Sequence, residues 1–202
     1  MNSNAMFNIS YGLYVLSAEE EGKDNGCIVN TLLQVTSTPN AVSITVNKQN
    51  YTHDMILRTG KFNVSMLSQS ADFELFKRFG FQSGKDVDKF DGFAGAKRSE
   101  NGILYVSESA NAYLSAEVFQ TVDLGTHTTF FAKVTDAEVL SEEESLTYAY
   151  YHKYIKPQPQ KATKAGYRCK ICGFVYEGEP LPEDYVCPLC KHGAEDFEKI
   201  EL

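Results

Sequence analysis

The stretch Val42-Ser43-Ile44-Thr45-Val46-Asn47 alternates apolar and polar side chains residue by residue. The same alternation returns in Phe62-Asn63-Val64-Ser65-Met66. A period of two is typical of strands with one buried face, because successive side chains of a strand point to opposite sides of the sheet. These two segments predict that a β-sheet forms the centre of the fold.

Further strands and a few short helices are expected around these two segments. Strand-like composition marks residues 13–17, 27–36, 103–106, 113–122 and 129–140. Most of these segments follow one another too closely for helical crossovers, so the sequence predicts a mainly β fold built as an antiparallel barrel. Short helices are expected at 52–58, at 71–79 with Ser70 as N-cap and Gly80 as C-cap, and at 142–154.

The composition of the 202 residues excludes several classes of protein. With 43% hydrophobic and 23% charged residues the chain can bury a core, and its 27 acidic against 19 basic residues make nucleic acid an unsuitable partner. The longest uncharged stretch, 25–47, contains too many polar residues to be a membrane helix. We therefore expect a globular protein without a nucleic-acid or membrane partner.

The N-terminus lacks the features of a secretory signal, because no basic residue precedes Lys23. Residues 3–5, Ser-Asn-Ala, resemble an expression-vector scar, and we expect the native chain to begin at Met6. The five cysteines include two Cys-x-x-Cys pairs, which in an unsecreted chain favour metal binding over disulfides. These features predict a cytoplasmic protein.

A basic segment divides the chain into two parts. No acidic residue occurs between Glu144 and Glu177, whereas six lysines and arginines do, and Pro157 and Pro159 interrupt any helix there. We expect a body at 6–152, a linker at 153–165 and a small C-terminal domain, the tail, at 166–202.

The tail carries the motif with the clearest chemistry. Cys169 and Cys172 form one pair, Cys187 and Cys190 form the second, and a hairpin of the intervening residues 173–186 would bring the pairs together. Four thiolates around one ion suit either iron or structural zinc, and the spacing alone leaves both open.

The residues around these cysteines resemble rubredoxin. The resemblance rests on Tyr167-Arg168-Cys169-Lys170-Ile171-Cys172-Gly173-Phe174-Val175-Tyr176 and on Leu181-Pro182-Glu183-Asp184-Tyr185-Val186-Cys187-Pro188-Leu189-Cys190. It implies that the metal is iron, held by the four cysteines, with zinc possible in overexpressed protein. Aromatic residues of the tail are expected to pack as a small core beside the metal: Tyr167, Phe174, Tyr176, Tyr185 and Phe197.

An electron-carrying iron site needs a donor, and the body is the place to look for it. The chain has no Gly-x-Gly-x-x-Gly motif, and the segment 80–86 is too short for a phosphate-binding loop. Nicotinamide delivers two electrons as hydride while an iron site accepts one, so a flavin is the natural converter between them.

Four segments of the body, in order, resemble the flavin reductase and flavoredoxin family. They are Asn25-Gly26-Cys27-Ile28-Val29-Asn30-Thr31 with its continuation to Pro39, Asn50-Tyr51-Thr52-His53, Ser83-Gly84-Lys85-Asp86-Val87-Asp88-Lys89-Phe90, and Gly125-Thr126-His127-Thr128. The resemblance implies an FMN-binding split barrel that forms a homodimer with the flavin near the subunit interface.

The resemblance also implies which residues contact FMN. The matching positions are Asn25, Cys27, Val29, Thr31, Asn47, Asn50, Tyr51, Thr52, Lys89 and His127. The first four would lie beside the isoalloxazine ring, with Cys27 as a contact and not a nucleophile. Asn47 and residues 50–52 would meet the ribityl chain and phosphate, with Lys89 and His127 adding donors. Thr52 would begin a helix, whose free amides attract anions.

Together the two parts resemble the high-molecular-weight rubredoxins. This implies that NADH or NADPH reduces FMN, that FMN reduces the rubredoxin iron, and that iron reduces an external partner such as a flavodiiron oxygen or nitric oxide reductase. Two alternatives remain at this stage. The chain could be a flavin reductase with a structural-zinc ribbon, or a non-enzymatic FMN/iron electron carrier that another protein reduces.

Overall fold

The computed structural model describes residues 2–157, 166–188 and 192–200. The body contains the strands β1 (Tyr14–Glu20), β2 (Lys23–Val29), β3 (Leu33–Ser37), β4 (Asn40–Asn47), β5 (Lys61–Leu67), β6 (Ala96–Arg98), β7 (Leu104–Val106), β8 (Ala110–Asp123) and β9 (His127–Val139). Its helices are Ser3–Asn8, α1 (Tyr51–Thr59), α2 (Phe73–Gly80), α3 (Tyr148–Tyr150) and the π-helical turn Tyr151–Ile155. The tail adds β10 (Gly166–Cys169), β11 (Val175–Tyr176), the short helix Ala194–Asp196 and β12 (Phe197–Ile200).

The body is an antiparallel sheet of seven strands in the order β2-β1-β5-β8-β9-β4-β3. The sheet curls around a core of mainly aliphatic side chains from most of its strands and from α1. Ile44, Val46, Phe62, Val64 and Phe130 are fully buried there. The alternation in β4 and β5 therefore produces the predicted buried face, and the predicted mainly β barrel is confirmed.

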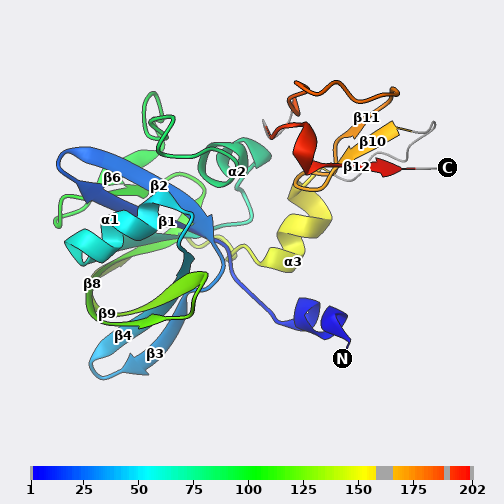
Figure 1. Ribbon diagram of the computed structural model, residues 1–202. Coiled ribbons are helices and arrows are strands. Elements are labelled where there is room, and N and C mark those ends of the chain that lie inside the picture. Colours follow the sequence, from blue (N-terminus) through cyan, green and yellow to red (C-terminus); the bar gives the residue numbers. More distant parts are fainter. Residues whose placement is uncertain (1, 158–165, 189–191, 201–202) are drawn as a thin grey trace.

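A second apolar cluster covers the outer face of the sheet. Phe76 and Phe79 of α2 pack there with Leu67, Leu146 and Tyr151. Figure 1 shows α2 beside the sheet, with the C-terminal strands beyond it. This cluster fixes α2 to the body.

One predicted strand is interrupted. Residues 27–36 are divided between β2 and β3, and Thr31 lies in the connection. The reason is topological, because β2 and β3 are the two outer strands of the same sheet. The hydroxyl of Thr31 donates to the carbonyl of Thr45 at 2.6 Å and accepts from the amide of Thr45 at 3.2 Å, which anchors the crossing to β4.

The predicted bounds of two helices are wrong. The N-cap of α2 is Asp72, whose carboxylate accepts from the amide of Leu75, and the predicted cap Ser70 instead donates to Glu143. Gly80 is the last helical residue, not the C-cap. The predicted helix 142–154 begins only at Tyr148, because the chain before it pairs with β5: the amide of Leu146 donates to the carbonyl of Leu67 at 2.7 Å.

Candidate functional site

The first turn of α1 begins with backbone amides that no side chain caps. Its N-cap, Asn50, makes no side-chain capping hydrogen bond. The side chain of Asn47 accepts from the amide of Gln49 and so shapes the turn that leads into the helix. Free amides at the start of a nine-residue helix attract an anion. The geometry therefore fits the phosphate of a flavin mononucleotide.

A buried polar cluster lies directly behind this turn. The side-chain amide of Asn25 donates to the hydroxyl of Thr52 at 2.9 Å, and both side chains are buried. The amide of Asn50 lies 3.7 Å from the sulfur of Cys27. Burial raises the pKa of the Cys27 thiol, so the sulfur stays protonated and is not a nucleophile at neutral pH.

The side-chain carbonyl oxygen of Asn25, Oδ1, has no hydrogen-bond partner within the part of the chain that the structure describes. It lies next to Gly84, where the Cβ atom of any larger residue would approach it to 2.1 Å. Gly84 therefore lets the backbone of the loop 82–86 close over Asn25. A buried acceptor without a partner is costly, and a donor on a bound ligand would satisfy it.

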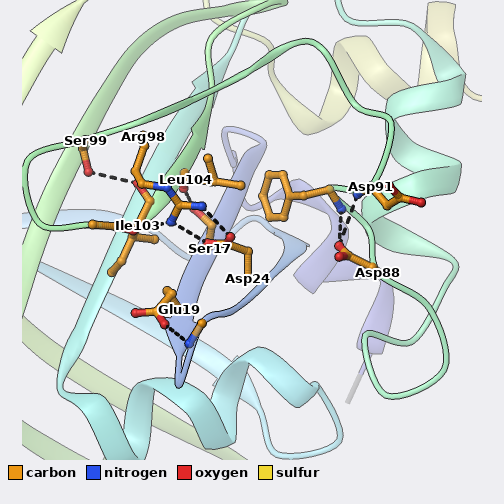
Figure 2. Close-up of polar contacts among 12 residues, drawn as sticks. Ser17, Glu19, Asp24, Asp88, Asp91, Arg98, Ser99, Ile103 and Leu104 are labelled. Atoms are coloured by element: carbon orange, nitrogen blue, oxygen red, sulfur yellow. Dashed lines mark hydrogen bonds and ion pairs between the residues drawn. The ribbon is translucent and has the colours of Figure 1, made fainter.

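Lys89 lies in the next part of that loop, with its ammonium turned inward. Its Nζ atom donates to the carbonyl of Gly26 at 2.8 Å and to that of Phe79 at 3.2 Å. Burial lowers its pKa. Asp88 holds the turn around Lys89, because its carboxylate accepts from the amides of Phe90 and Asp91, as Figure 2 shows.

The hairpin β6–β7 contacts the strand pair β1–β2 (Figure 2). Arg98 pairs with Asp24 of β2 at 2.7 Å. The hydroxyl of Ser17 on β1 donates to the carbonyl of Leu104 on β7 at 2.5 Å. These contacts hold the strand that carries Asn25 and Cys27.

The other residues expected to contact the flavin lie in three parts of the body. Cys27 and Val29 point their side chains into the barrel core, which leaves their backbone as the group able to face a flavin. His127 lies opposite Asn47 in the ladder between β4 and β9. The ring of Tyr51 lies 4.7 Å from the ammonium of Lys23.

Sequence reasoning did not single out His53. Its imidazole is buried, bonds the hydroxyl of Thr128 at 2.9 Å through Nε2 and the carboxylate of Asp54 at 2.8 Å through Nδ1, and packs edge-on against Phe130. It ties α1 to β9 close to His127. The signal was present, because His53 ends the quoted Asn50-Tyr51-Thr52-His53 segment.

The ten expected flavin residues lie on β2 and the connection after it, at the start of α1, in the loop 83–90 and at the adjoining ends of β4 and β9. The structure places the side chains of Thr52 and Lys89 inside the protein, where they hold neighbouring groups. Their direct contact with a flavin phosphate stays a prediction.

Three of the four predicted metal ligands converge in the tail. The sulfurs of Cys169, Cys172 and Cys187 all lie within 4.8 Å of one another and are buried, while Cys190 lies outside the described residues. The Cys172 and Cys187 sulfurs are 3.5 Å apart. Four sulfurs placed tetrahedrally at about 2.3 Å from one ion would lie about 3.8 Å apart. The donor set fits an iron or zinc ion.

The local backbone turns the first cysteine pair toward the ion. The amide of Gly173 donates to the carbonyl of Cys169 at 2.9 Å, and the amide of Cys169 donates to the carbonyl of Phe174 at 2.8 Å. Gly173 has a φ of 81°, a conformation that favours glycine. The spacing Cys-x-x-Cys-Gly thus produces a tight turn with both sulfurs on one side.

Four of the five aromatic residues expected to pack beside the metal, Phe174, Tyr176, Tyr185 and Phe197, do so. Tyr185 contacts Tyr176 at 4.6 Å and Phe197 at 5.4 Å between ring centroids. Phe174 and Phe197 pack against the cysteines. Phe174 and Phe197 thus cover the buried sulfurs with apolar surface from within the tail.

Comparison with sequence families finds two domains in the chain. The flavin reductase like domain family matches residues 6–157, and the rubrerythrin, rubredoxin-like domain family matches residues 167–198. Within the described residues, no helix combines the length and the apolar character needed to cross a membrane.

Two relatives cover most of the chain. A high molecular weight rubredoxin of Moorella thermoacetica is 37% identical, covering 99% of this chain and 100% of its own. A ferric-chelate reductase (NAD(P)H) of Archaeoglobus fulgidus is 40% identical over 81% of this chain and 96% of its own. The structure is also similar to that of the NADH:FAD oxidoreductase SgcE6 of Streptomyces globisporus, with a TM-score of 0.66 at 21% identity, covering 79% of this chain and 92% of that one.

Proposed function

Because the chain belongs to the flavin reductase-like family and carries a rubredoxin-like domain, as the high molecular weight rubredoxins do, we propose that NAD(P)H reduces an FMN in its body and that FMN reduces an iron in its tail. The chain is an oxidoreductase with a flavin and iron as its cofactors. The observation that carries the proposal is the presence, in one chain, of a flavin reductase-like barrel and a cluster of buried thiols at metal-binding distances.

The residues of the body have binding and orienting roles in this proposal. The first amides of α1 would bind the FMN phosphate, and the backbone of β2 would face the isoalloxazine ring. The side-chain amide of Asn25 donates to the hydroxyl of Thr52, and its Oδ1 atom is left to accept a hydrogen bond from the ligand. The bound FMN supplies the conversion of a two-electron hydride donor into a one-electron donor.

Anaerobic stopped-flow mixing with NADH or NADPH tests the proposal on protein from iron-replete cells. We expect flavin absorbance to bleach first and ferric-thiolate absorbance to follow. Metal analysis on the same sample must find iron near one per chain. Zinc alone under these conditions, or iron that stays oxidised after flavin reduction, would contradict the proposal and favour a flavin reductase with a structural-zinc ribbon.

We propose further that the reduced iron serves a protein acceptor in the cytoplasm, such as a flavodiiron oxygen or nitric oxide reductase. The family resemblance supports this step. Reoxidation of the reduced iron by such a partner, with rates that depend on partner concentration, is the measurement. An equal reoxidation rate with and without the partner would exclude it.

We also propose a homodimer. Large apolar side chains are exposed on the hairpin β8–β9, where Phe119 is 61% and Leu124 58% accessible, and on β3, where Leu33 is 64% accessible. Surfaces of this kind are typical of interfaces between subunits. Light scattering should give twice the chain mass, and Phe119→Glu should shift it toward the monomer.

A second acceptor is favoured by the similarity to the ferric-chelate reductase, which covers 81% of this chain. In this alternative the flavin reduces a small ferric chelate without using the tail. Cys172→Ser distinguishes the two acceptors. Chelate reduction at an unchanged rate assigns that activity to the flavin, and its loss assigns it to the iron.

A further inference from the structure

The C-terminal end of α2 lies directly on the strand that carries the proposed flavin contacts. A Cβ atom added to Gly26 of β2 would lie 3.2 Å from the ring of Phe79, and one added to Gly80 would lie 3.4 Å from the side chain of Ile28. Two glycines thus let helix and strand approach closely. Lys89 fastens the same junction, because it bridges the carbonyls of Gly26 and Phe79.

The next residue along, Phe81, reaches the metal site. Its ring packs against the cluster of Cys169, Cys172 and Cys187 together with aromatic and aliphatic side chains of the tail. Among the described residues, it is the one member of this cluster that comes from the body. Residues 79–81 span at most about 7.6 Å along the chain, so three consecutive residues connect β2 to the cysteines. Figure 1 shows α2 between the sheet and the C-terminal strands.

A second contact between the two parts carries positive charge. A cavity of about 240 Å³ beside Cys169 and Cys172 is lined by His152 at the end of the body, by Lys156 of the linker and by other residues of the tail, namely Arg168, Lys170 and Glu198. Four thiolates leave a net charge of minus one with ferric and minus two with ferrous iron. Lysine and arginine side chains nearby therefore stabilise the reduced site more than the oxidised one.

A cavity of about 550 Å³ lies beside α2 at the edge of this contact. Residues of the body form most of its lining, Arg78 and Phe81 among them, and Pro188, next to Cys187, is the one described residue of the tail there. The tail thus meets the body through Phe81 and through the groups around Cys169.

From this arrangement we propose that the tail docks on α2 of its own chain, and that Phe81 is the positioning residue that holds the metal site at the end of α2 for electron transfer from the flavin. The inference rests on the proposed function. In that reaction one NAD(P)H and two ferric sites give NAD(P)⁺, two ferrous sites and one proton. Because each chain holds one iron site, that site would take the two electrons one at a time and would pass the first to the external acceptor before it takes the second.

The docked state is tested without turnover by NMR relaxation of the zinc-loaded protein, which is diamagnetic. We expect tail and body amides to report one common rotational correlation time. In Phe81→Asp the tail should report a correlation time at least twofold shorter than the body. The matched control is Val87→Ala, an exposed apolar side chain in the loop that follows, which should leave one common value. A tail that tumbles independently in the unchanged protein would overturn the proposal.

Stopped-flow reduction of the iron-loaded protein supplies the second measurement. We expect Phe81→Asp to slow iron reduction at least tenfold while flavin reduction by NADH keeps its rate, and Val87→Ala to change neither. The iron-reduction rate of the unchanged protein should not depend on protein concentration. Equal iron-reduction rates in Phe81→Asp and the unchanged protein would refute the dock and leave the proposed function intact. Flavin reduction without iron reduction in the unchanged protein would refute the proposed function, and the relaxation result would still decide the dock.

Discussion

The ammonium of Lys89 lies 2.8 Å from the carbonyl oxygen of Gly26, sixty-three positions away in the sequence. A second bond reaches the carbonyl of Phe79, so one buried side chain joins an outer strand of the sheet to the end of α2. Charged hydrogen bonds in a buried position contribute more than neutral ones at the surface. Lys89 thus links β2, the strand proposed to contact the flavin, to α2, the helix that contacts the tail.

Lys89→Met should lower the free energy of unfolding by about 2 kcal/mol, since it leaves two buried carbonyls without their donor. Thermal or urea unfolding of the full chain measures this. Lys85→Met is the matched control, because the Lys85 side chain is exposed in the same loop, and it should change stability by less than about 0.5 kcal/mol. Equal stability of the two variants would show that the two bonds are not stabilising.

Thr52→Val should weaken FMN binding about tenfold, equal to about 1.4 kcal/mol. The change removes the hydroxyl that accepts from Asn25 and so releases the side chain behind the first turn of α1. Fluorescence titration of the flavin-free protein gives the dissociation constant. Thr59→Val, at the opposite end of α1, should keep the original affinity. Identical constants for both variants would separate Thr52 from the flavin site.

Cys172→Ser should abolish ferric-thiolate absorbance while flavin absorbance remains, because the sulfur belongs to the metal cluster and the flavin site lies in the body. Cys27→Ala is the matched control. It removes a buried thiol of the body and should keep iron at the original stoichiometry. Iron retained in Cys172→Ser would contradict the assignment of the ligands.

Tyr113→Phe should reveal a pH-dependent contribution to stability. The hydroxyl donates to Asp136 at 2.7 Å, and this carboxylate, with burial, raises the pKa of Tyr113 above its ordinary value of 10.0. A raised folded-state pKa means that the contribution is complete below pH 10 and declines as the pH rises further, because only the unfolded chain then loses the proton.

At pH 8 the Tyr113→Phe variant should therefore be less stable than the unchanged protein by about 1 kcal/mol. The difference should shrink above pH 10. Urea unfolding at a series of pH values measures both. A difference that stays constant from pH 8 to pH 11 would contradict the shift.

Much of the fold could be predicted because its signals are local. The alternation in 42–47 and 62–66 depends on which face of each strand is buried, and the sequence contains that pattern directly. The break at Thr31 could not be read locally, because it arises from β2 and β3 lying at opposite edges of the sheet. The late start of α3 has the same origin, since Leu146 pairs with Leu67 across the fold.

The metal site and the flavin site also differ in how far local sequence determines them. The spacing of Cys169 and Cys172 places their sulfurs through a single turn, so the metal site could be predicted from the residues themselves. The flavin residues were identified only through a family resemblance, because they come from four separated segments. The sequence cannot show that Thr52 and Lys89 face inward, which depends on Asn25 and Gly26 arriving from another strand.

The position of Lys89 also bears on how the protein avoids polymerising. β2 is an outer strand, and outer strands invite strands of other molecules to add to their unpaired backbone groups. At Gly26 the carbonyl is already bonded to a positive charge held beside the strand. An incoming strand would have to displace that charge. The same contact that joins sheet and helix therefore also opposes the addition of another strand at this point of the edge.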